Sequence, residues 1–177
     1  TWKIEAAGKI DADIAVTKDD EFPDLPRFGV RMFLDKKLSA VRYFGMGPQE
    51  SYCDKHQAAS HGLYHANVDD LHEDYIRPQE NGSHYDCEYV ELNNSRYGIV
   101  VSAENAFSFN ASYYTQEELE EKTHNYELTE SDSVVFCVDY ALNGIGSNSC
   151  GPVVLEQYRF DDVLFRFQFT LIPYVKG

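Results

Sequence analysis

The stretch Leu164-Phe165-Arg166-Phe167-Gln168-Phe169-Thr170-Leu171 alternates between two kinds of side chain. Every second residue is a phenylalanine or the final leucine, and arginine, glutamine and threonine stand between them. Successive side chains of a β-strand point to opposite faces of a sheet. The stretch therefore predicts a strand whose aromatic face lies in an apolar core and whose other face meets solvent or a second layer.

The same period of two recurs along most of the chain and predicts further strands. They cover residues 2–6, 8–16, 28–34, 38–44, 86–92, 97–102, 106–110, 134–142, 155–160 and, around the opening stretch, 163–172. The polar link Asp35-Lys36-Lys37 is short enough to join two of them in a hairpin. So many strands with short turns predict an all-β fold, an antiparallel two-sheet sandwich that forms a single domain over residues 1–177.

Helix is scarce in this sequence. One short helix is predicted near residues 115–122, where Thr115 and Glu118 have the spacing of a capping box. A weaker helical candidate covers residues 50–59.

Composition limits the classes of partner. The chain has 177 residues, with 30 acidic and 15 basic side chains and a formal net charge of −15. An acidic surface repels nucleic acids and anionic membranes, so neither is expected as a partner. The four cysteines are scattered and fit reduced thiols better than a disulfide framework, so a cytoplasmic location is expected.

The tripeptide Pro-Gln-Glu occurs twice, ending at Glu50 and at Glu80, and both copies lie where a predicted strand gives way to a turn. Retaining glycosidases need two carboxylates about 5 Å apart, and two turns of a sandwich can meet in space. A carboxylate at a turn can instead accept backbone N–H groups and fix the loop, or contact a ligand. These two interpretations are favoured over catalysis.

Other candidate sites have weaker signals. His61 and His65 have the spacing of metal ligands on a helix, but Gly62 disfavours a helix there, and no metal site is predicted. Cys150 with His124 as base is a weak nucleophile candidate. The Gly-rich segment 144–152 lacks the lysine of a phosphate loop and is predicted to be a long exposed loop, a place where function often resides.

Four motifs occur in an order that is familiar. They are Leu25-Pro26-Arg27-Phe28-Gly29, Gly45-Met46-Gly47-Pro48-Gln49-Glu50-Ser51-Tyr52, Pro78-Gln79-Glu80-Asn81-Gly82, and the segment from Gly144-Ile145-Gly146 to Cys150-Gly151-Pro152. Together they resemble the C-terminal domain of large bacterial β-galactosidases of glycoside hydrolase family two. Some members carry this domain on a separate small subunit.

The resemblance implies an antiparallel β-supersandwich similar to galactose mutarotases, here without its first strands. It implies that the parent protein is a retaining hydrolase of terminal β-D-galactosides such as lactose. The catalytic glutamates and the metal ligands of that family belong to a separate (β/α)₈ barrel, which has no counterpart in this sequence. The chain is therefore expected to hold no catalytic residue and no metal, while the parent enzyme uses Mg²⁺ and Na⁺ ions bound elsewhere.

The resemblance also implies site residues and partners. Ser149, Cys150 and Gly151 would form a substrate-pocket loop, in which many relatives have tryptophan at the position of Cys150. Sugar contact or a turn clasp is expected of four further residues, Glu50, Glu80, Asn81 and His84. The expected partners are the catalytic barrel domain or large subunit, a galactoside substrate, and further copies in an oligomer.

The alternative is a stand-alone carbohydrate-binding or aldose-mutarotase-like module. Such an epimerase would need a histidine and a glutamate that face one sugar. The sequence offers His84 or His124 with Glu50 or Glu80.

Overall fold

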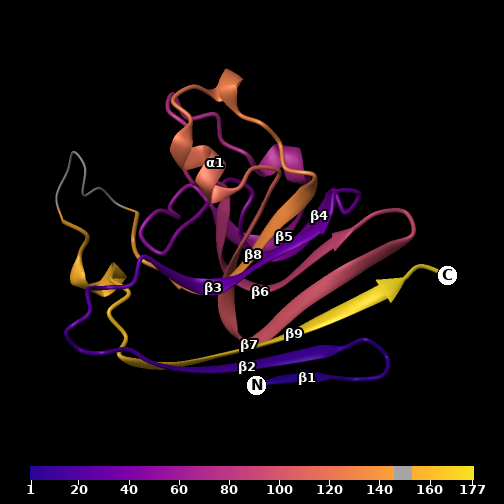
Figure 1. Cartoon of the computed structure of the whole chain (residues 1–177), viewed down its shortest axis with the longest axis horizontal. Helices are drawn as coiled ribbons and strands as arrows, with labels where there is room; N and C mark the ends of the chain where they lie inside the picture. Colours follow the sequence, from indigo (N-terminus) through magenta and orange to yellow (C-terminus); the bar gives the residue numbers. More distant parts are fainter. Residues whose placement is uncertain (146–152) are drawn as a thin grey trace.

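A computed structural model describes residues 1–145 and 153–177. Within them the chain forms mostly antiparallel β-sheet with one short α-helix, which confirms the predicted all-β class (Figure 1). The strands are β1 (Trp2–Ile4), β2 (Ile10–Thr17), β3 (Arg27–Asp35), β4 (Ala40–Gly47), β5 (Ser60–Asn67), β6 (Ser83–Asn93), β7 (Tyr97–Ser112), β8 (Ser133–Leu142) and β9 (Leu164–Val175). The helices are α1 (Gln116–Glu121) and the 3-10 helices η1 (Val68–Leu71), η2 (Asn125–Glu127) and η3 (Glu156–Tyr158).

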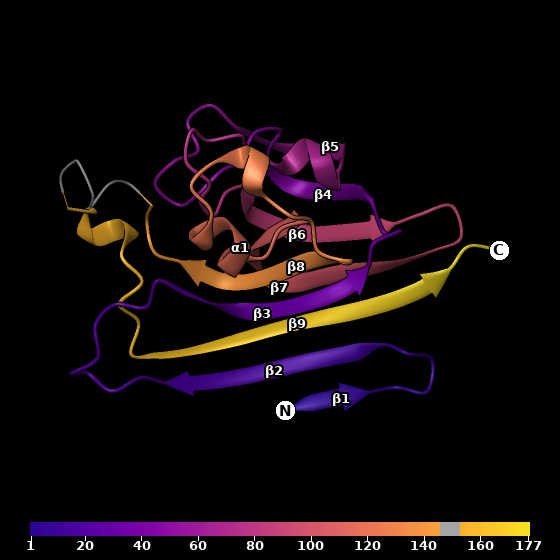
Figure 2. The ribbon, with the colours of Figure 1, turned by 45° about the horizontal axis from the view of Figure 1, so that its top comes forward.

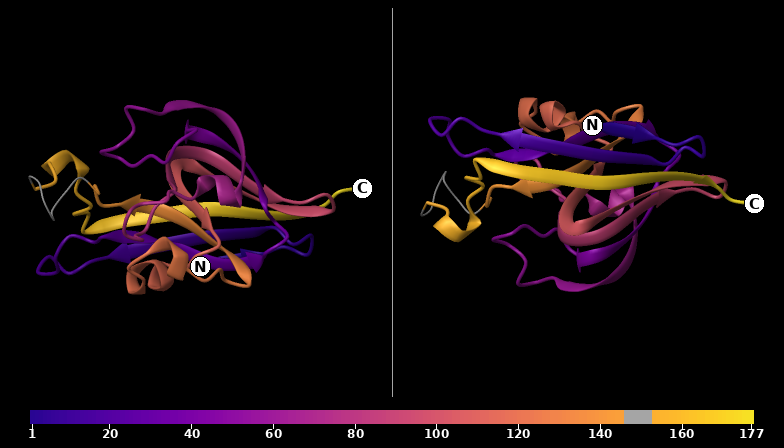
Figure 3. Two further views of the ribbon diagram at one scale, coloured as in Figure 1. Left: turned by 90° about the horizontal axis from the view of Figure 1, so that it is seen from above. Right: turned by 90° about the horizontal axis from the view of Figure 1, so that it is seen from below.

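The aromatic stretch near the C-terminus forms β9, as its alternation predicts. Phe165, Phe167, Phe169 and Leu171 are buried, whereas Arg166 and Gln168 are exposed. β9 lies between β2 and β7 in the sheet, and β2 and β9 run side by side along the length of the molecule (Figure 3). The last strand of the chain is therefore an interior strand of the sheet.

Hydrogen bonds join all nine strands into one sheet that forks at β7 (Figure 2). One edge of β7 pairs with β6. Its other edge changes partner, because Tyr97–Ser102 pair with β9 and Ser108–Ser112 pair with β8. One branch of the fork is β9-β2-β1, and the other is β8-β3.

The two branches pack against each other through aromatic side chains. The rings of Phe28 on β3 and Phe165 on β9 meet edge to face at 5.0 Å, and Tyr140 on β8 stacks on Phe165 at 4.7 Å. One continuous apolar core contains residues of both branches, including Phe136 and Phe167. Edge-to-face and offset contacts of this kind are the favourable arrangements of aromatic pairs.

Helix α1 confirms the predicted short helix. The hydroxyl of Thr115 accepts a hydrogen bond of 3.1 Å from the backbone N–H of Glu118, as an N-cap should. The carboxylate of Glu118 does not return this bond to Thr115 but accepts from the backbone N–H of Thr129. Half of the predicted capping box is therefore present.

Several local predictions are wrong. β3 and β4 do not form a hairpin, because β3 pairs with β8 while β4 pairs with β5 and β6. Within residues 155–160, Glu156–Tyr158 form the 3-10 helix η3 and none forms a strand, and residues 50–59 form turns rather than a helix. The edge strand β5 was not predicted as a strand.

The three cysteines within the described residues, Cys53, Cys87 and Cys137, are free thiols. No helix in the described parts of the chain is long and apolar enough to span a membrane.

Candidate functional site

Two turns that carry the Pro-Gln-Glu copies lie against each other. Residues 48–55 follow β4, and residues 73–82 precede β6. The backbone N–H of Ser51 donates to the carbonyl oxygen of Ser83 at 2.7 Å, which joins the two segments directly. We call residues 48–55 and 73–84, the latter with the first two residues of β6, together the paired turns.

Glu50 is the buried centre of the paired turns. Only 5% of its side chain is exposed. Its carboxylate accepts hydrogen bonds from the Lys55 ammonium, the hydroxyls of Tyr75 and Tyr52, and the backbone N–H of Gly82, the last at 2.8 Å. Burial alone would raise the pKa of Glu50, but the bonds from Lys55, Tyr75 and Gly82 outweigh it and hold the pKa below its ordinary value.

Asn81 and Gly82 form the tip of the second turn. The Asn81 side chain accepts from the backbone N–H of Glu73 and donates to the carbonyl oxygen of Gln79, both at 2.9 Å. Gly82 has a φ of +73°, and a Cβ there would lie 2.2 Å from the carbonyl oxygen of Leu71. Only glycine fits this position without strain.

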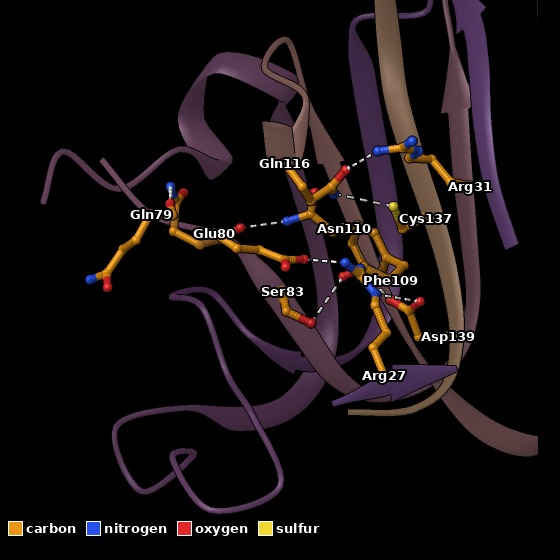
Figure 4. Close-up of polar contacts among 12 residues, drawn as sticks. Arg27, Arg31, Gln79, Glu80, Ser83, Phe109, Asn110, Gln116, Cys137 and Asp139 are labelled. Atoms are coloured by element: carbon orange, nitrogen blue, oxygen red, sulfur yellow. Dashed lines mark hydrogen bonds and ion pairs between the residues drawn. The ribbon is translucent and has the colours of Figure 1, made fainter. Parts of the chain in front are cut away.

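Glu80 has a cation of its own, separate from that of Glu50 (Figure 4). It forms an ion pair with Arg27 at the start of β3. The same guanidinium binds Asp139 of β8 through two bonds, of 2.8 Å from Nε and 2.7 Å from a terminal nitrogen. Burial opposes the charge of Arg27, but the bidentate bond to Asp139 raises the pKa of Arg27 above its ordinary value.

Asp139 was missed as a site residue, and a signal for it exists in the sequence. Its side chain is 2% exposed and interrupts the apolar strand β8. A lone carboxylate in a buried strand needs a cationic partner. Gly29 opposite provides the space, since a Cβ there would lie 2.1 Å from the Asp139 carboxylate.

His84 lies in the core rather than on the surface. It is 1% exposed, and its ring lies within 4.5 Å of the Tyr43 ring and 5.0 Å of the Phe109 ring. Nδ1 lies 3.3 Å from the carbonyl oxygen of Met46, whereas Nε2 has no hydrogen-bond partner among the described residues. Burial lowers the pKa of His84 to about 4, so the imidazole is neutral at pH 7.

The histidine–glutamate pairs of the epimerase alternative are only partly brought together. His84 and Glu50 line the same small hollow of about 220 Å³ beside Pro48. His124 instead lies on the surface, with Thr123 and Glu127 as its neighbours. The Glu50 carboxylate already accepts from four donors of this chain, so it is poorly suited to act as a base.

Ser149, Cys150 and Gly151 lie outside the described residues, and their predicted role stays a prediction. The first end of their loop is held by neighbouring segments. Gly144 donates its N–H to the Tyr158 carbonyl oxygen at 2.9 Å, and Ile145 donates to the Asp54 carboxylate at 3.1 Å. The loop therefore begins next to the first of the paired turns.

No group of three or more histidine, cysteine or acidic side chains in the described parts of the chain could hold a metal ion. His61 and His65 lie on β5, and the His61 ring contacts the backbone of Asp86 on β6.

Comparisons with known proteins agree on one family. The family model described as "Beta galactosidase small chain" matches residues 1–171. The chain is 52% identical over 171 residues to a beta-galactosidase of Actinobacillus pleuropneumoniae and 39% identical over 171 residues to one of Staphylococcus xylosus. Each match covers 97% of this chain but 17% of the relative, so the chain spans about a sixth of the length of these proteins. A beta-galactosidase of Kluyveromyces lactis is 32% identical over 168 residues, which are 93% of this chain and 16% of the relative.

Proposed function

The chain belongs to the beta-galactosidase small chain family, and on that basis we propose that it is the C-terminal domain, or the separate small chain, of a β-galactosidase. The whole enzyme would hydrolyse terminal β-D-galactosides such as lactose with retention of configuration. This part would be non-catalytic: it would complete one wall of the active site and support assembly. We propose the supersandwich as its fold and the cytoplasm as its location, where the three free thiols would stay reduced.

The observation that supports the non-catalytic role is that both Pro-Gln-Glu carboxylates are ion-paired within this chain. Glu50 is paired with Lys55 and Glu80 with Arg27. A glycosidase needs one carboxyl group that is free to protonate the leaving group and one that faces the sugar. Carboxylates held by cations of the same chain suit a turn clasp better than either task.

An exposed apolar rim supports docking onto the rest of the enzyme. Its members are Phe22, Ile145, Val153, Leu155, Val163 and Leu164, each at least 40% exposed. They lie on adjacent segments, since Lys18 bonds to Val163 and Leu25 to Phe160 through the backbone. This end of the molecule carries η3 and lies opposite the C-terminus (Figure 1). Clustered apolar side chains on a surface are typical of protein interfaces, and the catalytic barrel domain or large chain is the proposed partner.

Expression of residues 1–177 alone tests the non-catalytic role. The chain should not hydrolyse a chromogenic galactoside, whereas mixing it with the remainder of the enzyme should restore turnover. Turnover by the isolated chain at enzyme-like rates would contradict the proposal.

Substitution within the apolar rim tests the docking surface. Leu155→Asp and Leu164→Asp should weaken the restoration of activity, because each places a charge where an apolar contact forms. Val175→Asp is the matched control, since Val175 is also exposed but lies at the opposite end of β9. Equal restoration by all three variants would show that this end does not form the interface.

The mutarotase-like alternative has less support. Its glutamate candidates are both ion-paired, and His84 is buried and neutral.

A further inference from the structure

A hollow of about 410 Å³ opens where the sheet forks. Its walls come from five parts of the fold: the turn after Glu50, β6, β7, β8 with the start of β9, and η3 with the residues that follow it. We call it the fork hollow. Its lining includes Tyr85, Asp86, Asn105, Tyr140, Tyr158 and Asp162.

The fork itself creates this space. β7 pairs with β9 up to Ser102 and with β8 from Ser108, so neither branch pairs with residues 103–107. β6 also leaves its regular register here, with shifts between His84 and Cys87 and between Cys87 and Tyr89. Bulges of this kind bend a strand and redirect its side chains, and they are frequent next to functional sites.

Asp86 at this irregularity has a backbone conformation that suggests a functional constraint. Its φ of +56° is the one positive value at a non-glycine residue in the described parts of the chain. Aspartate tolerates the left-handed region better than most residues, but the conformation still carries strain. Asp86 lines the fork hollow next to Tyr85, and its carboxylate also lies 3.8 Å from Nε2 of His61.

Polar groups without partners converge on the hollow. Within the described residues, the hydroxyls of Tyr85, Tyr140 and Tyr158 make no hydrogen bond, and neither do the side chains of Asn105 and Asp162. Burial raises the pKa of Tyr85 and of Tyr140, and the nearby carboxylates of Asp86 and Asp162 raise them further, so both phenols stay protonated as donors. A site with several donors and acceptors in reach of one another suits a polyhydroxylated ligand.

Two of the aromatic rings are held rigidly. Tyr140 stacks on Phe165 with ring centroids 4.7 Å apart, and Tyr85 stacks on His56 at 5.6 Å. A ring supported from one side offers an apolar surface without a large loss of conformational entropy on binding. Such surfaces pack against the C–H groups of a sugar ring while the hydroxyls reach the polar groups around them.

The charges in the hollow favour a neutral ligand. The hollow is lined by the carboxylates of Asp86 and Asp162 and by the guanidinium groups of Arg159 and Arg166. Because Arg166 forms an ion pair with Asp13, the lining offers no excess positive charge to an anionic ligand. The chain as a whole has a formal net charge of −15, which repels phosphorylated ligands. A volume of about 410 Å³ lies within the range of roughly 300–1,000 Å³ typical of small-molecule sites.

We propose that the fork hollow binds a neutral saccharide of one or two sugar units, with Asn105, Asp162 and the tyrosine hydroxyls as its hydrogen-bonding groups. This goes beyond the role in a galactosidase, because it assigns a sugar site to residues of this chain alone. The test measures sugar binding and not turnover. If the chain bound no sugar, the proposed function would still stand, and if the chain failed to restore turnover, the sugar site would still stand.

The test is a nuclear magnetic resonance titration of the isotopically labelled 177-residue chain with lactose, galactose and a sugar phosphate. Lactose or galactose should cause saturable shifts at residues 85–86, 105–108 and 140–142, with weaker binding of the phosphate. The absence of saturable shifts, shifts confined to other residues, or tighter binding of the phosphate would each overturn the proposal.

Two variants and a neighbouring control identify the binding groups. Asp162→Asn and Asn105→Ala should each weaken sugar binding by roughly tenfold, because the first replaces a charged acceptor by a weaker neutral one and the second removes a hydrogen-bonding side chain. Asp161→Asn makes the same chemical change one residue away, outside the lining of the hollow, and should bind as the unmodified chain does. All three sites are exposed, so the fold should persist. Unchanged affinity in both Asp162→Asn and Asn105→Ala would overturn the assignment.

Discussion

At the scale of single residues, two identical tripeptides acquire different environments. Glu50 is buried and accepts from four donors, whereas Glu80 is 38% exposed and reaches across to Arg27. Their shared Pro-Gln-Glu sequence predicts a turn and a fixed carboxylate but not the partner. Apart from Tyr52 and Lys55, the partners lie 25 to 53 residues away in the chain, which no local pattern encodes.

His84 should make the stability of the chain depend on pH. In the unfolded chain its pKa is about 6.5, whereas in the fold it is about 4, so only the unfolded state binds a proton between these values. The folded state is therefore fully favoured above pH 6.5 and loses up to about 3 kcal/mol as the pH falls to 4. Urea unfolding at pH 7 and pH 5 measures this difference.

His84→Gln should flatten that pH dependence, while His65→Gln should leave it unchanged, because His65 is exposed on β5 and solvated in both states. If His84→Gln kept the full slope of the unmodified chain, other groups would be responsible.

At the scale of elements, the alternating pattern predicts best those strands that have one buried and one exposed face. β9 was predicted because its two faces meet different environments. β5 was missed because Ser60–Asn67 is polar and contains a glycine, and as an edge strand it buries little apolar surface. Residues 155–160 were expected as a strand, but they pair with no strand: Glu156–Tyr158 form η3, Leu155 is exposed in the rim, and Phe160 is buried.

The turn before β6 depends on Gly82. Gly82→Ala should lower the free energy of unfolding by about 1–3 kcal/mol, because alanine at φ +73° is strained and its Cβ meets the Leu71 carbonyl oxygen. Gly8 has a φ of +89°, and a Cβ added there would lie 3.3 Å from the side chain of Pro173. Gly8→Ala therefore measures the backbone strain without a collision with the backbone. Urea unfolding of both variants should find Gly82→Ala the less stable; the opposite order would contradict this account of the turn.

At the scale of the whole molecule, Arg27 joins three distant parts of the chain. It connects β3, β8 and the second of the paired turns (Figure 4). Arg27→Met should lower the free energy of unfolding by about 3–5 kcal/mol, because it leaves the buried Asp139 carboxylate without a cation. Arg27→Met combined with Asp139→Asn should recover part of this loss.

Arg31→Met provides the matched control on the same strand. Its ion pair with Glu117 is solvent-exposed on both sides, so its loss should cost less than about 1 kcal/mol. Thermal or urea unfolding of the three variants distinguishes these cases. Similar losses for Arg27→Met and Arg31→Met would contradict the importance of burial.

Sequence patterns predicted the strands better than their pairing. The β3–β8 and β2–β9 pairs join residues about a hundred or more positions apart, and the short link after β3 wrongly suggested a hairpin with β4. In the candidate site, too, local features could be predicted and long-range contacts could not. The turns that hold Glu50 and Glu80 could be located from proline and glycine, whereas the Arg27–Asp139 pair and the fork hollow exist only through contacts between distant strands.

The interior position of β9 has a consequence for how the chain is made. β1 and β2 reach the sheet only through β9, which follows every other described strand in the chain and therefore leaves the ribosome after them. Until β9 is made, the edges of β2 and β7 that pair with it have no partner. Pairing of the first strands with β9 is slow, because it closes a very long loop. A nascent chain would therefore stay open to association with other chains, and with chaperones, until translation of this part is complete.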